Sequence, residues 1–282
     1  MPETVPPPPP APTPPVPAAL RLVQTVVAGR WRATGEELYR EVASLLGDGE
    51  GQGKEFLVVG SGDGVTVEWL AARTGAHVTG IDADRVRVRN AEERRRSTRA
   101  RVHVIYEQAP YEDLPHEDAV FDAVVAEPPL SSSRDLERSI AELVRVTKPL
   151  GVIVLLQPTW TSELPVATRE LLVERTGLRP HHLMEWKAML RDAGVVEIQV
   201  QDWSSGGPAR RNSGSFRAVE PPPQLSWHQK MHIVGRAWRR WGWRAARGAL
   251  ERETLLIEEL SRQRALGFQL ISGVKWPHAI RK

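Results

Sequence analysis

The sequence predicts an α/β protein in which a mostly parallel sheet is covered by helices on both faces. Three observations predict it: short apolar runs alternate with helical stretches, a glycine-rich turn follows the first run, and an acidic residue ends the second. Strands that alternate with helices of this length indicate βαβ units. With 282 residues, 41% of them hydrophobic, the chain can bury a substantial core.

The expected strands are apolar or alternating segments at 55–60, 76–82, 101–106, 121–127, 151–157, 195–202 and 265–276. The expected helices between them lie at 65–74, 84–99, 132–147 and 181–193. A helical segment at 18–47 precedes the sheet, and Thr34 with Glu37 has the spacing of a capping box. Its apolar face carries Leu38, Val42, Leu45 and Leu46.

Composition divides the chain into five parts. Residues 1–17 are predicted to be a proline-rich extended arm, either disordered or held by a partner. The other parts are N-terminal helices at 18–50, a core at 51–203, a polar linker with a Trp/Arg-rich helical insertion at 204–264, and the last strand with a tail at 265–282. The late strand is expected to return to the same sheet, so the core is one domain.

Several function classes are excluded by composition. The chain has no cysteine, which excludes disulfides, thiolate metal sites and thiol nucleophiles. Histidines lack a clustered carboxylate partner, so no metal site is expected. No signal peptide or apolar run of membrane-spanning length is seen, and we expect a cytoplasmic protein, with peripheral membrane attachment left open.

The glycine-rich turn, residues 60–64, follows an apolar strand and precedes a helix. This context suits a nucleotide, because glycines allow the backbone to approach the ligand and the helix amides face it. The dinucleotide fingerprint would place a glycine at position 65, where the chain has Val65. A nicotinamide dinucleotide is therefore disfavoured, and a reductase is the weaker interpretation.

Asp82 ends the second predicted strand. A carboxylate at this position can accept hydrogen bonds from the two hydroxyls of an adenosine ribose. Asp84 is better placed to cap the following helix. Asp82 therefore indicates an adenosine-bearing ligand without identifying it.

Four segments in this order, LVVGSGDG, VTGIDAD, YEDLPHEDAVFDAVVAE and IAELVRVTKPLGVIVLL, resemble the class I S-adenosylmethionine-dependent methyltransferases. The resemblance covers about residues 25–203, and 265–276 is similar to the last, antiparallel strand of that fold. It implies a Rossmann-like, seven-stranded, mostly parallel sheet with a helical insertion before the last strand, and S-adenosylmethionine as cofactor.

The resemblance also implies site residues. The methionine and ribose parts of the cofactor would lie against Gly60, Ser61, Gly62 and Gly64, and the ribose hydroxyls would be held by Asp82. Adenine would lie against Ala83 and beside the stretch 108–112, which includes Ala109. Glu127 with Pro128 would lie near the reactive methyl group.

Two positions depart from the family pattern. Val58 replaces an acidic residue that organises the charged amino-acid end of the cofactor, and Pro110 replaces an Asp that accepts from adenine. Either loss removes a hydrogen bond worth about 1–3 kcal/mol. Asp63 and Glu127 are the nearby carboxylates that could replace the first.

Catalytic residues are not identified by the sequence, because methyl transfer requires mainly positioning and a base only for some acceptors. Glu127 and His116 are the weak candidates. Glu127 opens the segment EPPL, a poor match to a motif that grips amino groups. His116 titrates near neutral pH but lies in a polar turn.

The segment 236–252 combines Trp238 and Trp241 with five arginines. It can be a lid over the substrate, a contact surface for a protein or membrane, or, less favoured, a surface for single-stranded nucleic acid. The sequence therefore supports two functions. The first is a methyltransferase acting on a small-molecule acceptor. The alternative is a non-catalytic subunit that docks through residues 1–17 and 236–252 onto a larger, membrane-associated assembly.

Overall fold

A computed structural model describes residues 35–97, 102–161, 164–167, 169–170, 173, 179–203 and 266–277. The arm expected at 1–17, the helical segment expected at 18–34 with Thr34 of the capping box, and the insertion expected at 204–264 lie outside the described residues. The bounds of the N-terminal and C-terminal parts therefore stay predictions. In the described ranges no helix combines the length and the apolar composition needed to cross a membrane.

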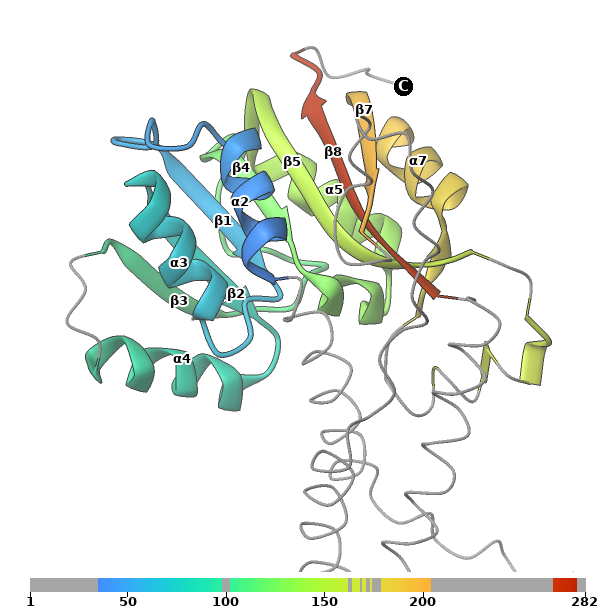
Figure 1. The fold of residues 1–282 in the computed structure, drawn as a ribbon, viewed down its shortest axis with the longest axis horizontal. Helices are drawn as coiled ribbons and strands as arrows, with labels where there is room; N and C mark the ends of the chain where they lie inside the picture. The colour runs from blue at the N-terminus through green and yellow to red at the C-terminus, as the bar shows by residue number, and fades with distance from the viewer. Residues whose placement is uncertain are drawn as a thin grey trace, which may run out of the picture.

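The centre of the molecule is one sheet in which parallel strands predominate (Figure 1). Seven strands follow the order β3-β2-β1-β4-β5-β8-β7, and the two-residue β6 pairs with β5 beside this path. The strands are β1 (Glu55–Val59), β2 (His77–Asp82), β3 (Val104–Gln108), β4 (Phe121–Ala126), β5 (Thr147–Trp160), β6 (His181–His182), β7 (Val195–Asp202) and β8 (Leu266–Lys275). β8 runs antiparallel to both β5 and β7. The Rossmann-like α/β fold class and the return of the last strand to the sheet are confirmed.

Helices cover both faces of the sheet. In Figure 1, α2 (Gly35–Leu45) and α3 (Val65–Thr74) lie on the viewer's side and α5 (Leu136–Val146) lies behind the strands. Residues of α4 (Arg85–Ser97) join the same apolar cluster as α2 and α3, whereas α7 (Leu183–Asp192) joins the cluster of α5. A short 3-10 helix, η1 (Pro128–Ser132), connects β4 to α5.

Strand β1 shows how the sequence pattern produces two cores. Phe56 and Val58 are buried in the cluster with α2 and α3, and Leu57 and Val59 in the cluster with α5. Because successive side chains of a strand point to opposite faces, a continuous apolar run is required where both faces are covered. The predicted apolar face of the N-terminal helix follows the same logic, since Leu38 and Val42 are buried.

Element boundaries differ from expectation where partner strands decide them. β3 begins at Val104, because its parallel ladder with β2 begins at the pair Val78–Val104. β5 continues past Pro158 to Trp160, because β8 pairs with it over that length. The expected helix at 132–147 is shorter than predicted, because η1 ends at Ser132, α5 spans Leu136–Val146 and β5 begins at Thr147.

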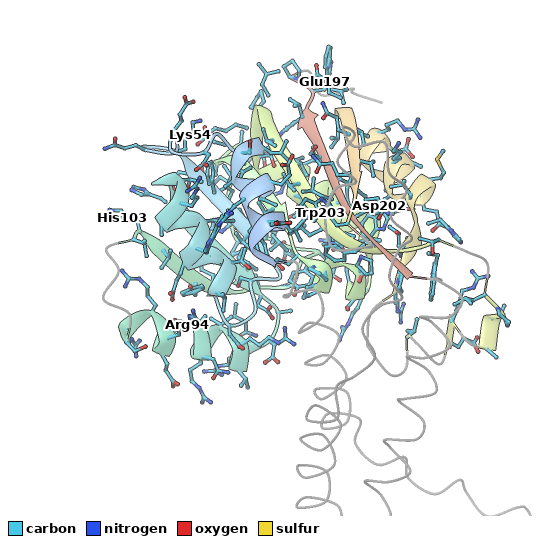
Figure 2. All side chains as sticks on the ribbon, in the orientation of Figure 1. Lys54, Arg94, His103, Glu197, Asp202 and Trp203 are labelled. Atoms are coloured by element: carbon cyan, nitrogen blue, oxygen red, sulfur yellow. The ribbon has the colours of Figure 1, made fainter. Side chains whose placement is uncertain are left out.

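The strand ends form two margins of the sheet, which we call the carboxyl edge and the amino edge. The carboxyl edge comprises the segments that follow β1, β2 and β4, at 60–64, 82–84 and 127–129; the amino edge comprises Lys54 and the residues around 118–122, 145–148 and 275. Figure 2 shows Lys54 at the upper margin, where β1 begins. Strand order reverses between β1 and β4, and ligands of open α/β sheets bind at the carboxyl ends beside such a point.

Candidate functional site

The glycine turn after β1 is built on left-handed backbone. Gly60, Gly62 and Gly64 have φ of 80°, 55° and 79°, and Gly64 is the N-cap of α3. Only glycine adopts these angles without strain. The N–H groups of Gly60 and Ser61 both donate to the carbonyl of Ile81, at 2.8 and 2.9 Å, so the turn is tied to the end of β2.

Tyr106 supports this turn from β3, and sequence reasoning missed it. Its hydroxyl donates to the carbonyl of Gly64 at 3.1 Å. A β-carbon at Gly64 would lie 2.3 Å from the same hydroxyl. The ring crosses β2 at Gly80, where a β-carbon would lie 3.0 Å from Tyr106 Cδ1. Gly64 and Gly80 are therefore required for the close approach of the buried Tyr106 ring. The hydrogen bond from Tyr106 to the Gly64 carbonyl also holds the turn in place.

Asp82 joins the end of β2 to the turn. Its Oδ2 accepts from Gly62 N–H and its Oδ1 from Asp84 N–H, both at 2.9 Å. The residue is 3% exposed, and burial raises the pKa of its carboxyl although these two backbone bonds and Arg87 lower it. An ionised carboxylate accepts about four hydrogen bonds, so each oxygen retains capacity for one more donor.

The region expected to hold adenine contains two side chains that the sequence analysis did not identify. Ala83 is exposed, and its N–H donates to the hydroxyl of the buried Tyr111, whose pKa is raised by burial and by the nearby Asp82. Arg87 lies near the turn, since its Nη1 is 3.7 Å from the β-carbon position of Gly62, and its charge acts on both Asp82 and Tyr111. Tyr111 and Arg87 are thus both close to Asp82.

The residues of the stretch 108–112 differ in position: some lie near Ala83, and others are part of the core. The Gln108 amide reaches the Ala83 carbonyl at 3.5 Å, whereas the side chain of Ala109 is buried among the residues under α5. Glu112 accepts from Ser133 Oγ at 2.6 Å and from Arg134 N–H at 2.7 Å. Burial would raise the pKa of Glu112, but these hydrogen bonds lower it. Glu112 therefore anchors the turn before α5.

Glu127 follows β4 directly and lies beside the turn. A β-carbon on Gly60 would be 3.3 Å from Glu127 Cβ. The hydroxyl of Tyr39, on α2, donates to Glu127 Oε1 at 2.9 Å and Oε2 at 3.1 Å. The buried amide of Gln157 donates to the carbonyl of Glu127 at 2.8 Å, so main chain and side chain are both held.

The structure gives the two catalytic candidates different surroundings. Glu127 is at the carboxyl edge, whereas the His116 ring packs edge-on against Phe121, the first residue of β4, with ring centroids 4.9 Å apart. His116 Nε2 also lies 3.4 Å from Glu107 Oε2, near the end of β3. These contacts tie His116 to β3 and β4. No group of side chains in the described part of the chain is arranged to hold a metal ion.

Comparison with known proteins gives the same assignment as the motifs. A family model described as a methyltransferase domain matches residues 57–155. The methyltransferase GfsG of Streptomyces halstedii is 26% identical over 156 residues, 54% of this chain and 56% of that protein. The 27-O-demethylrifamycin SV methyltransferase of Amycolatopsis mediterranei is 30% identical over 156 residues, 54% of this chain and 57% of that protein. The chain therefore spans little more than half the length of these relatives.

Solved structures show the fold at lower identity. Phosphoethanolamine N-methyltransferase 2 of Haemonchus contortus, in complex with phosphomonomethylethanolamine and S-adenosylhomocysteine, has a TM-score of 0.66 at 16% identity, covering 86% of this chain and 53% of that one. The [4+2]-cyclase SpnF has a TM-score of 0.67 at 20% identity, covering 92% and 94%. Because a fold hosts more than one function, the reaction is argued from the site. The alternative of a docking subunit finds no support in these comparisons.

Proposed function

We propose that this chain, which matches a methyltransferase-domain model over residues 57–155, is a class I S-adenosylmethionine-dependent methyltransferase and transfers a methyl group from that cofactor to a small-molecule acceptor. The observation that carries the proposal is the unit made by Asp82 and the glycine turn. The carboxylate that would accept the ribose hydroxyls also holds the Gly62 N–H, so loop and acid are fixed together.

The residues fit an adenosyl group. Asp82 keeps two acceptor positions for two vicinal hydroxyls, and its burial strengthens such bonds because little water competes. Ala83 is exposed beside it and provides a small apolar contact for adenine, and Arg87 lies near Gly62 of the turn. The turn offers backbone atoms to the cofactor at Gly60, Ser61, Gly62 and Gly64. Ala109 can offer only its backbone, because its side chain is buried in the core. Glu127 lies next to Gly60 at the point where strand order reverses.

When bound, the cofactor would supply a methyl group on a sulfonium: the lone pair of an acceptor would form a bond to the methyl carbon as the S–CH3 bond breaks, and the electrons of the broken bond would stay on the sulfur of S-adenosylhomocysteine. The contribution of the chain is to hold donor and acceptor in line and to exclude water, which can account for about 7–11 kcal/mol of a barrier. A general base is needed only if the acceptor must lose a proton.

Amines and hydroxyls are the acceptor groups to test first, because related proteins are named for methylation at nitrogen of phosphoethanolamine and at the 27-oxygen of a rifamycin. We propose that the acceptor is a small molecule of one of these two chemical groups. The choice between them is made by residues that approach the carboxyl edge.

The test is turnover. The full chain is incubated with S-adenosylmethionine and single acceptors, including phosphoethanolamine, sarcosine and 27-O-demethylrifamycin SV, while S-adenosylhomocysteine is quantified. We expect S-adenosylhomocysteine to form with at least one amine or hydroxyl compound. Its rate of formation should fall about a hundredfold in Asp82→Ala, because two charge-assisted hydrogen bonds to the cofactor are lost. The rate should change little in Asp122→Asn, at the amino edge. Formation that is equal in wild type and Asp82→Ala would contradict the proposed site.

A further inference from the structure

The position of the short strand β6 follows from its pairing with β5. In this parallel ladder, His181 pairs with Thr159 and His182 pairs with Trp160. The other side of β5 is occupied at the same two residues, because β8 pairs with Thr159 and Trp160 as well. A strand has only two pairing sides, so β6 lies on the side of β4 and continues the line of β4 beyond its end.

An interruption of the ladder separates β4 from β6. The last residue of β4, Ala126, pairs with Leu155, and His181 pairs with Thr159 further along β5. Because a strand rises about 3.3 Å per residue, β6 begins about 13 Å beyond Ala126. Glu127, the residue after Ala126, lies next to the glycine turn. The pairing therefore brings His181 to the carboxyl edge, on the line that leads outward from Glu127.

Gln157 holds the main chain at the inner end of this interruption. Its side chain is fully buried, and its amide donates to the carbonyls of Ala126 and Glu127, at 3.1 and 2.8 Å. These bonds fix the chain at the point where β4 leaves the sheet. Since Gln157 belongs to β5 and His181 pairs with β5, both ends of the interruption are positioned by one strand.

Two residues of α7 hold the His181 ring. The ring contacts Trp186 edge-on, with ring centroids 5.6 Å apart, and Trp186 is fully buried. Nδ1 of His181 lies 3.4 Å from Oε2 of Glu185, and the same oxygen accepts the N–H of His182 at 2.7 Å. The His181 side chain is 34% exposed, so the ring is anchored and still accessible.

This arrangement favours Nε2 of His181 as a proton acceptor. A carboxylate beside Nδ1 stabilises the tautomer that carries its proton on Nδ1, and Nε2 then keeps its lone pair. Catalytic hydrogen bonds are often long before a substrate is bound, so a separation of 3.4 Å is compatible with this pairing. The other described neighbours of the ring, Thr159 and Trp186, are uncharged. Glu185 is therefore the group that directs the proton.

His182 has a different place in the structure. It is the N-cap of α7 and forms a capping box with Glu185. Its contribution is to the end of the helix, where a capping box satisfies backbone N–H groups. The two adjacent histidines therefore provide a candidate base, His181, and a matched control position, His182.

We propose that His181, directed by Glu185, is the general base of the methyl transfer and that the acceptor is a hydroxyl compound. The inference rests on the proposed function and decides between its two acceptor groups. His181 is then a catalytic residue, and Glu185 is a positioning residue that acts through it.

The proton and the electrons balance in this step. As the hydroxyl oxygen forms a bond to the methyl carbon, its proton passes to Nε2 of His181. The S–CH3 bond breaks and its electrons stay on the sulfur, and the imidazolium then releases the proton to water. An unprotonated amine has a lone pair ready for transfer, so a positioned base is needed chiefly for the hydroxyl.

Turnover at saturating S-adenosylmethionine tests the base. Full-length wild type, His181→Gln, Glu185→Gln and His182→Asn are incubated with 27-O-demethylrifamycin SV and catechol as hydroxyl acceptors and with sarcosine as an amine. S-adenosylhomocysteine is quantified across the pH range in which histidine titrates. His182→Asn is the control, because asparagine is also favoured at an N-cap. Calorimetric affinity for S-adenosylhomocysteine reports whether each variant retains a folded cofactor site.

We expect wild type to methylate a hydroxyl acceptor and not sarcosine. His181→Gln should lower kcat/KM for the acceptor about a hundredfold and remove the fall in rate at acidic pH, because no base is left to protonate. Glu185→Gln should lower kcat/KM about tenfold, as for loss of one hydrogen bond to a charged group. His182→Asn should keep the wild-type rate, and all three variants should keep the wild-type affinity for S-adenosylhomocysteine.

A second measurement needs no acceptor. Nitrogen NMR of the protein with labelled histidines reports which ring nitrogen of neutral His181 carries the proton. We expect the proton on Nδ1 in wild type and a shift of the population toward Nε2 in Glu185→Gln. A proton on Nε2 in wild type would contradict the pairing with Glu185.

Other results would overturn the inference and leave the proposed function intact. These are a wild-type rate in His181→Gln with a hydroxyl acceptor, and methylation of sarcosine alone. A loss of S-adenosylhomocysteine affinity as large as the loss of rate in His181→Gln would assign the residue to the structure of the site. Binding of S-adenosylhomocysteine without turnover of any hydroxyl acceptor would contradict the acceptor class. If wild type bound no S-adenosylhomocysteine, the proposed function would be wrong, and the inference with it.

Discussion

The carboxyl pKa of Asp82 at the carboxyl edge and those of the ion-paired carboxylates at the amino edge are shifted in opposite directions. At the amino edge, Glu142 bonds to Arg145 at 2.7 Å and Asp122 to Lys148 at 2.8 Å. The bond from Arg145 lowers the pKa of Glu142, and for Asp122 the bonds from Lys148 and from the Glu55 N–H outweigh a burial that would raise the pKa. At the carboxyl edge, burial dominates and the pKa of Asp82 is raised.

Hydrogen bonding also differs between the edges. At the amino edge, Arg145 also bonds to Asp118 and to the carbonyl of His116, and Lys275 donates to the carbonyls that flank the start of β5. Among the described residues, the buried Ser61 Oγ and Gln157 Oε1 at the carboxyl edge have no hydrogen-bond partner, and the same is true of His116 Nε2 beside Phe121. Ion-pair networks thus stabilise the fold at the amino edge, and Ser61 and Gln157 leave polar groups available beside the glycine turn, as is typical of a binding site.

The largest effect is expected for Gly64→Ala, which tests the construction of the carboxyl edge. The new methyl group would overlap the Tyr106 hydroxyl at 2.3 Å. The alanine would also have to keep a backbone φ of 79°. Overpacking costs about 1–3 kcal/mol and left-handed backbone about 1–2 kcal/mol more. Thermal or urea unfolding measures the loss.

Gly75→Ala is the matched control for Gly64→Ala. Gly75 has φ of 78°, and its nearest neighbour would be 4.0 Å away, so this variant shows the backbone cost alone. Equal destabilisation of the two variants would contradict the role assigned to Tyr106.

The next effect is expected at the amino edge, for Glu142→Gln. Because the pKa of Glu142 is lowered in the folded protein, its contribution to stability is present above the unfolded value of 4.5 and is lost as pH falls through the folded value. We expect urea unfolding to show a loss of about 1–3 kcal/mol at pH 7 and a smaller loss at pH 3. Glu137→Gln, at an exposed position of the same helix, should change stability by less than about 0.5 kcal/mol at either pH. A Glu142→Gln cost that is the same at both pH values would contradict the ion-pair explanation.

The smallest effect concerns the raised pKa of Asp82. Ribose hydroxyls donate to the ionised carboxylate, so affinity for S-adenosylhomocysteine should be full above this pKa and fall as the carboxyl is protonated. The loss should begin at a pH above the ordinary value of 3.8 and reach about tenfold for each pH unit below the folded pKa. Folding has the opposite dependence, because a raised pKa makes the contribution of Asp82 to stability greatest below 3.8 and reduces it as pH rises. Affinity that is constant down to pH 4 would contradict the assignment.

Local pattern accounts for what the sequence could predict. An apolar run that ends in glycines predicts β1 and the turn, and Asp82 follows from its position at the end of β2, where the structure places it against Gly62. Asp84 was predicted as the cap of the next helix, and its carboxylate accepts from the Val86 N–H at 2.8 Å. These features depend on residues close together in the chain.

The supporting tyrosines could not be predicted in this way. Tyr39 meets Glu127 across 88 positions, and Tyr106 meets Gly64 across 42. Such contacts depend on how strands and helices are arranged, and side-chain periodicity carries no information about them. The only local indication is that Gly80 interrupts β2 where Tyr106 crosses it. Strand ends were missed for a related reason: the length of β5 is set by β8, more than a hundred residues later in the chain.

The central claim is that Asp82 and the glycine turn at the carboxyl edge bind an adenosyl cofactor. Calorimetric titration of S-adenosylhomocysteine into wild type, Asp82→Ala and Asp122→Ala tests it most directly. We predict saturable binding to wild type, an affinity about a hundredfold lower for Asp82→Ala, and wild-type affinity for Asp122→Ala despite its reduced stability. The absence of binding to wild type at millimolar ligand, or equal affinity of wild type and Asp82→Ala, would contradict the claim.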